Sequence, residues 1–429
     1  MRGTNVMPTN AMSRKWIPRA AAVLCAGVLV AGCGGTDSEP KAGSGGAAAP
    51  TVDAAALDTG SYPTSPAPEF GVATTENIIE VEGQRLAEFT VAPFEIDPEL
   101  TAGKMPTMVM RSGKNLGVVI SGRAGDIAHE NQMLYGYVST AATNTPNVTD
   151  PSRSVVNAVL RFGNPEIAAK VARAIQTELT TVDDGAGIAT AQTVDVLPNT
   201  LVSTRETNSS AGRTISVNAL TPHGDYLLYT WAQAPVGQKD WTAKAVAKAV
   251  SLQGPLIDKF PAQPTKEQNG GKSAEFPKVD QDKILIYAVP EKDKQAKLGD
   301  DMAVYGPRGM SHRSTNPPLT YRVLTETGAD HSAVAKTTVY RASDGAGART
   351  IADEFAKDLA AQGFAAAPSP QGLPDAKCVT KDTVRGTEIY CTVVNGRYVG
   401  EASGLDDKKD VDQQISAQYL ILEQADQNV

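Results

Sequence analysis

The chain has 429 residues, of which 41% are hydrophobic and 21% are charged, and its formal net charge is −8. This composition is that of a globular protein with a buried core, and the length suggests two domains of ordinary size. The negative charge argues against nucleic acid and anionic lipid headgroups as electrostatic partners, because phosphate binding needs clustered Lys and Arg side chains.

Residues 1–32 have the pattern of a secretory signal peptide. Four basic residues and no acidic residue precede an apolar run from Ala20 to Val30. That run is shorter than the about 20 residues that a membrane-spanning helix needs. The sequence that follows, Val30-Ala31-Gly32-Cys33, resembles the lipobox of bacterial lipoproteins, which implies cleavage before Cys33 and acylation of its thiol. An uncleaved anchor and an ordinary secreted protein are the alternatives.

Two stretches of the chain have a composition that disfavours packing. Residues 33–69 are rich in Gly, Ala, Ser and Pro, which predicts a flexible tether behind the lipidated cysteine. Residues 263–282 are polar and contain Gly270-Gly271, which predicts a linker. The remainder divides into a first domain, residues 70–262, and a second domain, residues 283–429.

Both predicted domains repeat one order of elements: a strand, a helix, three strands and a final helix. In the first, the strand over 154–162 contains Arg161 at its end, and Asn164-Pro165 starts the helix as N-cap and first helical residue. In the second, the strand over 336–342 contains Arg341 near its end. The pattern predicts an α+β protein of two related domains, each a mostly antiparallel sheet with helices packed on one face.

Cys378 and Cys391 lie at equal distances from the centre of a predicted hairpin turn, so they face each other across two strands. Export to an oxidising compartment favours a disulfide at that geometry. A redox-active or metal-binding pair is the alternative, although no Cys-x-x-Cys and no nearby His supports it. Val202 and Val217 are expected at the same positions of the first domain's hairpin, and their apolar character agrees with a structural disulfide.

Motifs for catalysis, metals and cofactors are missing from the sequence. No Gly-x-Ser-x-Gly occurs, and Ser311-His312 lacks the last glycine of a nucleophile elbow. The four histidines are far apart and form no His-Glu-x-x-His. We therefore predict no catalytic residue, no metal site and no cofactor.

Two arginines are candidates for anion binding. Arg161 and Arg341 each end a strand just before a helix N-terminus, where a guanidinium and free backbone N–H groups together bind carboxylate or phosphate. The alternative for each is an ion pair with a neighbouring acid, Glu166 or Asp344.

The densest cationic cluster of this acidic chain lies in the predicted loop 305–316. It contains Arg308, His312 and Arg313 beside a tyrosine, which makes it a candidate contact surface. A solvated charged loop is the alternative.

Several segments together have the character of a known family: Leu134–Thr140, Val304–His312, Thr338–Ala342, Cys378 to Cys391, Asn395–Tyr398 and Ala417–Tyr419. Through them the chain resembles an uncharacterised family of actinobacterial cell-envelope lipoproteins over most of residues 70–429. The resemblance implies location and fold and no particular activity. A looser, architectural similarity is to mycobacterial extracellular sensor modules.

From these observations we expect a protein lipid-anchored through Cys33 at the extracytoplasmic face of the cell membrane, acting as a binding or sensor-like module of the cell envelope and not as an enzyme. The expected partner is an envelope protein, polymer or lipid, and not nucleic acid. A carrier of a small or lipidic ligand is the alternative function. An envelope hydrolase that uses dispersed carboxylates is a further alternative, which no residue spacing supports or excludes.

Overall fold

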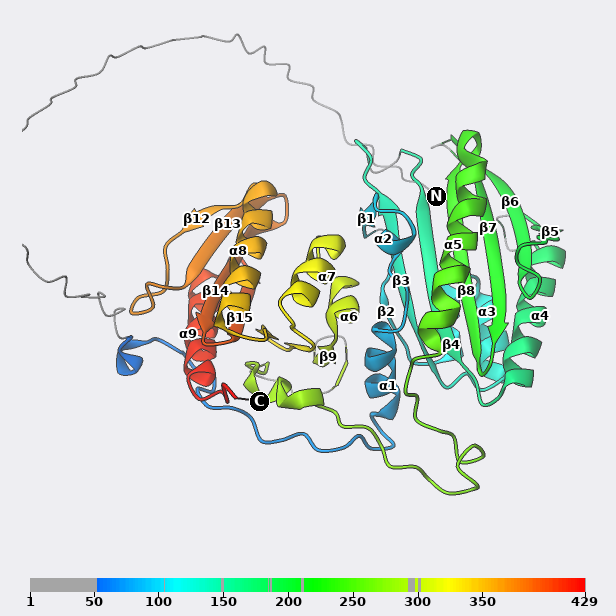
Figure 1. Cartoon of the computed structure of the whole chain (residues 1–429). Coiled ribbons are helices and arrows are strands. Elements are labelled where there is room, and N and C mark those ends of the chain that lie inside the picture. Colours follow the sequence, from blue (N-terminus) through cyan, green and yellow to red (C-terminus); the bar gives the residue numbers. More distant parts are fainter. Residues whose placement is uncertain are drawn as a thin grey trace, which may run out of the picture. The chain divides into compact units, whose positions relative to one another are not determined.

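Two antiparallel sheets with their helices organise the chain in the computed structural model, which describes residues 52–428 except 104, 148–149, 184, 186, 210–211, 292–297 and 300–301 (Figure 1). The signal peptide and Cys33 lie outside the described residues. No helix within the described part is long and apolar enough to cross a membrane.

The first sheet has eight strands within the described residues, in the order β1-β3-β4-β8-β7-β6-β5, with β2 paired to β3. The strands are β1 (Leu100–Ala102), β2 (Met108–Met110), β3 (Tyr135–Thr143), β4 (Ser154–Arg161), β5 (Thr190–Gln192), β6 (Leu201–Ser209), β7 (Gly212–His223) and β8 (Tyr226–Pro235). The helices of this half are α1 (Ile78–Ala87), α2 (Pro93–Ile96), α3 (Gly122–Glu130), α4 (Pro165–Thr181) and α5 (Lys239–Ile257).

The second sheet has seven strands within the described residues, in the order β12-β13-β14-β15-β11-β10-β9. The strands are β9 (Ala303–Tyr305), β10 (Ser332–Val334), β11 (Thr337–Arg341), β12 (Ala365–Ala367), β13 (Lys377–Thr383), β14 (Gly386–Asn395) and β15 (Tyr398–Leu405). The helices of this half are α6 (Pro307–Ser311), α7 (Pro317–Glu326), α8 (Gly345–Ala361) and α9 (Lys408–Leu422).

The expected repeat is present in the topology, although four strands and not three follow the first helix of each repeat, because the short strands β5 and β12 precede the predicted hairpins. The order β4-β8-β7-β6-β5 of the first sheet recurs as β11-β15-β14-β13-β12 in the second. The register agrees as well, since Arg161 lies opposite Tyr226 and Arg341 lies opposite Tyr398. The α+β class with one antiparallel sheet in each half is therefore confirmed.

One detail of the expected repeat is wrong by two residues. Val202 lies opposite Ala219, and the register between the last strands makes Ala219 the counterpart of Cys391. Val217, expected at that position, lies two residue pairs away along β7, opposite Thr204. The pairing of long strands is set by the whole ladder, so the hairpin alone does not fix it.

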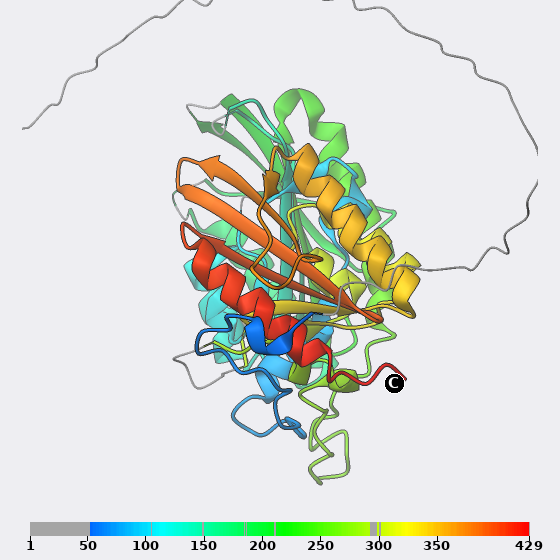
Figure 2. The same ribbon diagram turned by 90° about the vertical axis from the view of Figure 1, so that its left-hand side faces the viewer.

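The expectation that helices pack on one face of each sheet is wrong, because helices cover both faces. Adjacent residues of a strand point to opposite faces. Val155 packs in the cluster that contains α5, whereas Val156 packs in the cluster that contains α4. In the second half, Tyr398 packs with α9 and Val399 packs with α8. Figure 2 shows α9, in red, crossing the strands of this second sheet.

The expected tether ends earlier than residue 69. Leu57 and Tyr62 are 9% and 5% exposed and belong to the core cluster of the second half. The hydroxyl of Tyr62 donates to Asp410 of α9 over 2.8 Å. These two large apolar side chains within a polar segment are the sequence signal for its packing. Residues 33–51 lie outside the described part.

The stretch 263–282, expected to be a linker, is attached to the folded halves at both of its ends, while residues 266–273 between them are exposed. The backbone N–H of Gln263 donates to Glu82 of α1 over 2.9 Å. Further on, Val279 is 4% exposed, and Asp280 accepts hydrogen bonds from the N–H groups of residues 284–286. The two halves also share one apolar cluster, which contains Tyr137 and Tyr340.

Candidate functional site

A cavity of about 300 Å³ opens between the second sheet and the helices α7 and α8. Glu401 and Ser403 of β15 project into it, because alternate residues of a strand share a face. Thr338 and Thr392 lie opposite Glu401 on the neighbouring strands, and Tyr390 lies opposite Ser403. We call this cavity the Glu401 pocket; the residues of its lining used below are Arg313, Asn316, Thr338, Tyr340, Phe355, Asp358, Gln362, Phe364, Glu388, Tyr390, Glu401 and Ser403.

Four aromatic rings lie in the wall of the Glu401 pocket, among polar side chains that are more numerous. Tyr340 and Phe355 make an edge-to-face pair with ring centroids 5.4 Å apart. Phe364 and Tyr390 make a second pair at 5.3 Å. Such paired rings are held in fixed orientations, so they offer a preformed apolar surface to a ligand.

Two glutamates add negative charge to this aromatic pocket. Glu388 on β14 pairs with the exposed guanidinium of Arg385 over 2.6 Å. The carboxyl of Glu401 accepts a hydrogen bond of 3.5 Å from the hydroxyl of Tyr340. Burial of the carboxyl raises the pKa of Glu401 to about 7. Glu401 therefore changes its protonation state near neutral pH.

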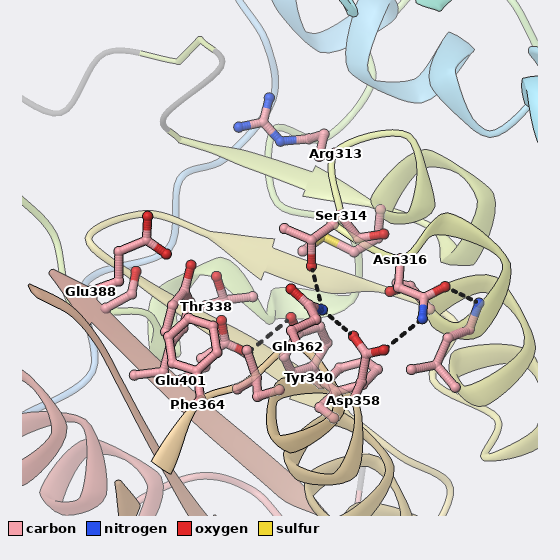
Figure 3. Close-up of a pocket in the computed structure, with 18 of the residues that line it drawn as sticks. Arg313, Ser314, Asn316, Thr338, Tyr340, Asp358, Gln362, Phe364, Glu388 and Glu401 are labelled. Carbon is pink, nitrogen blue, oxygen red and sulfur yellow. Dashed lines mark hydrogen bonds between the residues drawn. The ribbon is translucent and has the colours of Figure 1, made fainter. Parts of the chain in front are cut away.

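The helical side of the pocket is a fixed polar network. Asp358 of α8 accepts hydrogen bonds from the side-chain amides of Asn316 over 2.6 Å and Gln362 over 2.7 Å. Figure 3 shows these three residues facing one another across the pocket from Glu401. Because the amides occupy the carboxylate oxygens of Asp358, Glu401 is the carboxyl of this pocket that is better placed for an incoming group.

The predicted loop 305–316 divides between structural and exposed residues. Arg308 lies in α6, where its guanidinium contacts Glu95 over 3.0 Å, the carbonyl of Glu88 over 2.9 Å and the hydroxyl of Tyr321 over 3.1 Å. Its side chain is 14% exposed. The prediction of Arg308 as a contact residue is therefore wrong, because Glu95 and the carbonyl of Glu88 already bind its guanidinium.

The prediction of His312 as a contact residue is also wrong, because both nitrogens of its ring have hydrogen-bond partners inside the protein. The hydroxyl of Ser139 donates to Nδ1 over 2.8 Å, and Nε2 donates to the carbonyl of Ala87 over 3.0 Å. Burial lowers the pKa of His312 to about 4, so the ring is neutral at physiological pH. Ser139 is 1% exposed, and among the described residues no carboxylate is hydrogen-bonded to the ring, so we interpret this pair as structural.

Arg313 is the exposed member of the predicted cationic cluster. Its guanidinium lies over the ring of Tyr305, 5.5 Å from the centroid. It lines the Glu401 pocket and a neighbouring cavity of about 340 Å³ that His312 and Ser139 also border. Among the described residues it forms no ion pair with Glu401 or Glu388, and Figure 3 shows its guanidinium apart from both carboxylates.

Arg161 and Arg341 are buried and do not form an open anion site. Arg161, 3% exposed, donates to the hydroxyl of Tyr135 over 2.6 Å and to the carbonyl of Gln263 over 2.7 Å. Its carboxylate is Glu82, at 3.9 Å, and not Glu166. An acid distant in sequence thus supplies the ion pair that a neighbour was expected to supply.

Arg341 binds Asp282, in the segment that precedes the second sheet. It donates to the carbonyl of Asp282 over 2.9 Å and lies 3.7 Å from the carboxylate of the same residue. Asp344, the expected partner, instead caps α8 by accepting from the N–H groups of Ala346 and Gly347. A helix N-terminus is a strong attractor for an aspartate in the preceding position.

Cys378 and Cys391 form the predicted disulfide, with Cα atoms 4.1 Å apart across β13 and β14. Asp412 lies close enough to the two sulfurs to resemble a metal-ligand group, but disulfide sulfurs are not thiolates and do not bind as such. Ala402 lies opposite Cys391, so the disulfide lies on the face of the sheet that α9 covers. Glu401, the neighbour of Ala402 in β15, points to the other face.

A domain of unknown function, DUF7373, matches this chain with its N-terminal part over residues 70–271 and with its C-terminal part over residues 284–425. The chain belongs to the DUF7373 family. The expectation of an uncharacterised family is thereby confirmed, while its actinobacterial and lipoprotein character stays a prediction.

Other comparisons of this DUF7373 protein add little. No curated protein matches the chain. Among solved structures, the extracellular domain of PknH from Mycobacterium tuberculosis is similar at 10% sequence identity and a TM-score of 0.29, over 45% of this chain and 100% of that one. A likeness at that level carries no argument about function.

Sequence reasoning missed the Glu401 pocket of this DUF7373 protein altogether. A weak signal was present, because Glu401 interrupts a strand whose alternate residues, Tyr398, Gly400 and Ala402, are small or apolar and face α9. An ionisable residue on the other face of such a strand points either to solvent or to a pocket. Strand periodicity does not distinguish these two cases.

Proposed function

We propose that this DUF7373 protein is an exported, lipid-anchored, non-enzymatic binding protein that recognises a small ligand in the Glu401 pocket. The observation that supports this most directly is the pocket itself. Its volume of about 300 Å³ lies at the lower end of small-molecule sites. Its lining combines two pairs of aromatic rings with a larger number of polar side chains, which suits a small ligand that carries a polar group.

The pocket favours binding over catalysis. Among the described residues that line it, none is His or Cys, so no nucleophile there has an imidazole base. Asp358 is fixed by amides and Glu388 by Arg385, which leaves no second carboxyl poised to work with Glu401 as an acid–base pair.

The location in this proposal comes from the sequence. The basic segment, the short apolar run and Val30-Ala31-Gly32-Cys33 support export and acylation of Cys33. The disulfide agrees with an oxidising compartment. A ligand in that compartment is a part of an envelope polymer, protein or lipid, or a free small molecule outside the membrane.

A lipid carrier is the second candidate, because the cavity lies between a sheet and helices as a carrier's cavity would. Its volume of about 300 Å³ is small for acyl chains, and its lining contains glutamates. Both features favour recognition of a small or polar group over storage of a lipid.

Native mass spectrometry of the full chain, exported from an actinobacterial host, tests the proposal. We expect extra mass that is lost on denaturation. Ser403→Trp places a large ring at the pocket, and it should abolish the extra mass, whereas Ser403→Ala should keep it. Equal extra mass on wild type and Ser403→Trp would place the ligand elsewhere and contradict the proposal. A bare wild-type protein that also fails to bind added envelope extract would contradict it as well.

A further inference from the structure

We infer that the Glu401 pocket binds the ammonium group of its ligand, which rests on the proposed ligand-binding function of this pocket. Glu401 supplies the counter-charge, and the rings around it contact the body of the ligand. The resulting substrate class is a primary amine attached to a compact apolar or aromatic group.

Glu401 lies at the wall of the cavity. Its carboxyl borders the cavity, and Tyr340 is its hydrogen-bond partner. Within the described residues it has no cation as a partner. A buried carboxylate is costly without a compensating charge, so a bound cation stabilises the charged form.

The charged groups on the surrounding elements do not supply the cation that would neutralise Glu401. On β14, Glu388 is paired with Arg385. On α8, Asp358 is held by Asn316 and Gln362. These groups keep the pocket negative in total, which disfavours anionic ligands.

The two nearby cations are directed elsewhere. The guanidinium of Arg313 lies over the ring of Tyr305 and, among the described residues, forms no ion pair with Glu401 or Glu388. Lys381 of β13 donates to the carbonyl of Gln362 over 2.8 Å while its ammonium lies 5.5 Å from the centroid of Phe364. Phe364, a ring of the pocket lining, is thus already in contact with an ammonium group, that of Lys381.

The aromatic lining favours an organic cation over a metal ion. An ammonium group is attracted to the faces of aromatic rings, most strongly where water is excluded. Hard metal ions instead need several oxygen ligands around one point. Here the other two carboxyls of the lining, Asp358 and Glu388, already have partners, so among the described residues Glu401 has no second free carboxyl beside it. The rings of Tyr340, Phe355, Phe364 and Tyr390 lie in the wall among its polar side chains.

The burial of Glu401 adds a pH dependence to the binding. Its pKa of about 7 means that the carboxyl is mostly protonated at pH 6 and mostly ionised at pH 8. A cation binds the ionised form, so its apparent affinity scales with the ionised fraction. We expect binding about tenfold tighter at pH 8 than at pH 6 for an amine that stays protonated at both values.

The test compares 4-fluorobenzylamine with its neutral counterpart, 4-fluorobenzyl alcohol, by fluorine NMR titration of the full chain. The amine should bind at least about tenfold more tightly than the alcohol at pH 8. Glu401→Gln should remove this preference and the pH dependence together. Asp382→Asn, a change at an exposed acid of the same hairpin that does not line the pocket, should leave both unchanged.

The outcomes separate this inference from the proposed function. Equal binding of amine and alcohol in wild type and Glu401→Gln, with loss of both in Ser403→Trp, overturns the ammonium inference and supports the pocket. Binding of both compounds that survives in Ser403→Trp overturns both ideas. Binding of neither compound to wild type overturns the ammonium inference, and the co-purified mass then decides the function separately.

Discussion

Tyr340 and Glu401 project from neighbouring strands into one pocket, and the tyrosine hydroxyl donates to the carboxyl over 3.5 Å. This hydrogen bond favours the ionised carboxyl, but burial acts against it more strongly. The pKa of Glu401 therefore rises from 4.5 to about 7. A raised carboxyl pKa beside a cavity is a property more typical of a functional position than of a structural one.

Glu401 should make the protein less stable as the pH rises. The folded-state pKa lies above the unfolded value, so its contribution is fully present below pH 4.5 and is lost as the pH rises through 7. Glu401→Gln should therefore stabilise the protein relative to wild type, by about 2 kcal/mol more at pH 8 than at pH 5.5. Urea unfolding at the two pH values measures this difference. The same difference at both would contradict the raised pKa.

His312 should act in the opposite direction. Its folded-state pKa of about 4 lies below the ordinary 6.5, so stability is present above pH 6.5 and is lost as the pH falls towards 4. An NMR titration of the ring protons should show no protonation of His312 between pH 7 and pH 5.5. A midpoint near 6.5 would show that the ring is not desolvated as the structure places it.

The ion pairs of Arg308 with Glu88 and Glu95 should contribute more to stability than exposed ion pairs of the same composition. Arg308→Ala leaves Glu88 and Glu95 partly buried without their cation, which should cost about 3 kcal/mol. Arg322→Ala is the matched control, because Arg322 is 47% exposed and also contacts two glutamates. Its loss should cost less than about 1 kcal/mol. Equal effects in chemical unfolding would contradict the assigned burial.

The disulfide should stabilise the second half without contributing to the pocket. Closing a loop with a sequence separation of 13 residues stabilises by about 3 kcal/mol in the chain-entropy model. Cys378→Ser should lower the melting temperature under non-reducing conditions, and a reductant should then have no further effect. Binding of 4-fluorobenzylamine at low temperature should persist. Unchanged melting of Cys378→Ser would rule out the bond.

Cys33 should decide where the protein resides. Cys33→Ala removes the acylated thiol and should move the protein from the membrane fraction to the soluble exported fraction. Cys25→Ala is the matched control, because Cys25 lies within the predicted signal peptide and should not alter anchoring. Cell fractionation with immunoblotting measures both variants. Retention of Cys33→Ala in membranes would show that the lipobox prediction is wrong.

Local rules account for the parts of the fold that the sequence predicted. Asn164 caps α4 and Pro165 is its first residue, as expected from their side chains alone. The two hairpins form where turn residues separate apolar runs, and the Cys378–Cys391 pair follows from their symmetry about one turn. Each of these features depends on residues that are close in sequence, with a separation of 13 positions for the cysteine pair.

The faces of the sheets were within reach of the sequence, although the prediction was wrong. All eight residues of β4 are buried, and its run Val155-Val156-Asn157-Ala158-Val159-Leu160 lacks the alternation of a strand with one solvated face. A continuous apolar run is typical of a strand covered on both sides. The pattern thus carried the information that helices lie on both faces.

The sequence by itself determined the class, the internal repeat, the disulfide and the predicted export signal, because each of these depends on short-range order along the chain. The tertiary structure alone decided which charged residues are buried. Arg161, Arg308 and Arg341 find their acids at Glu82, Glu95 and Asp282, all distant in sequence. It also decided the Glu401 pocket, because residues from β11, β14, β15 and α8 surround that carboxyl only after the sheet has formed. Burial and charge pairing depend on which surfaces meet in space, and sequence spacing does not specify this.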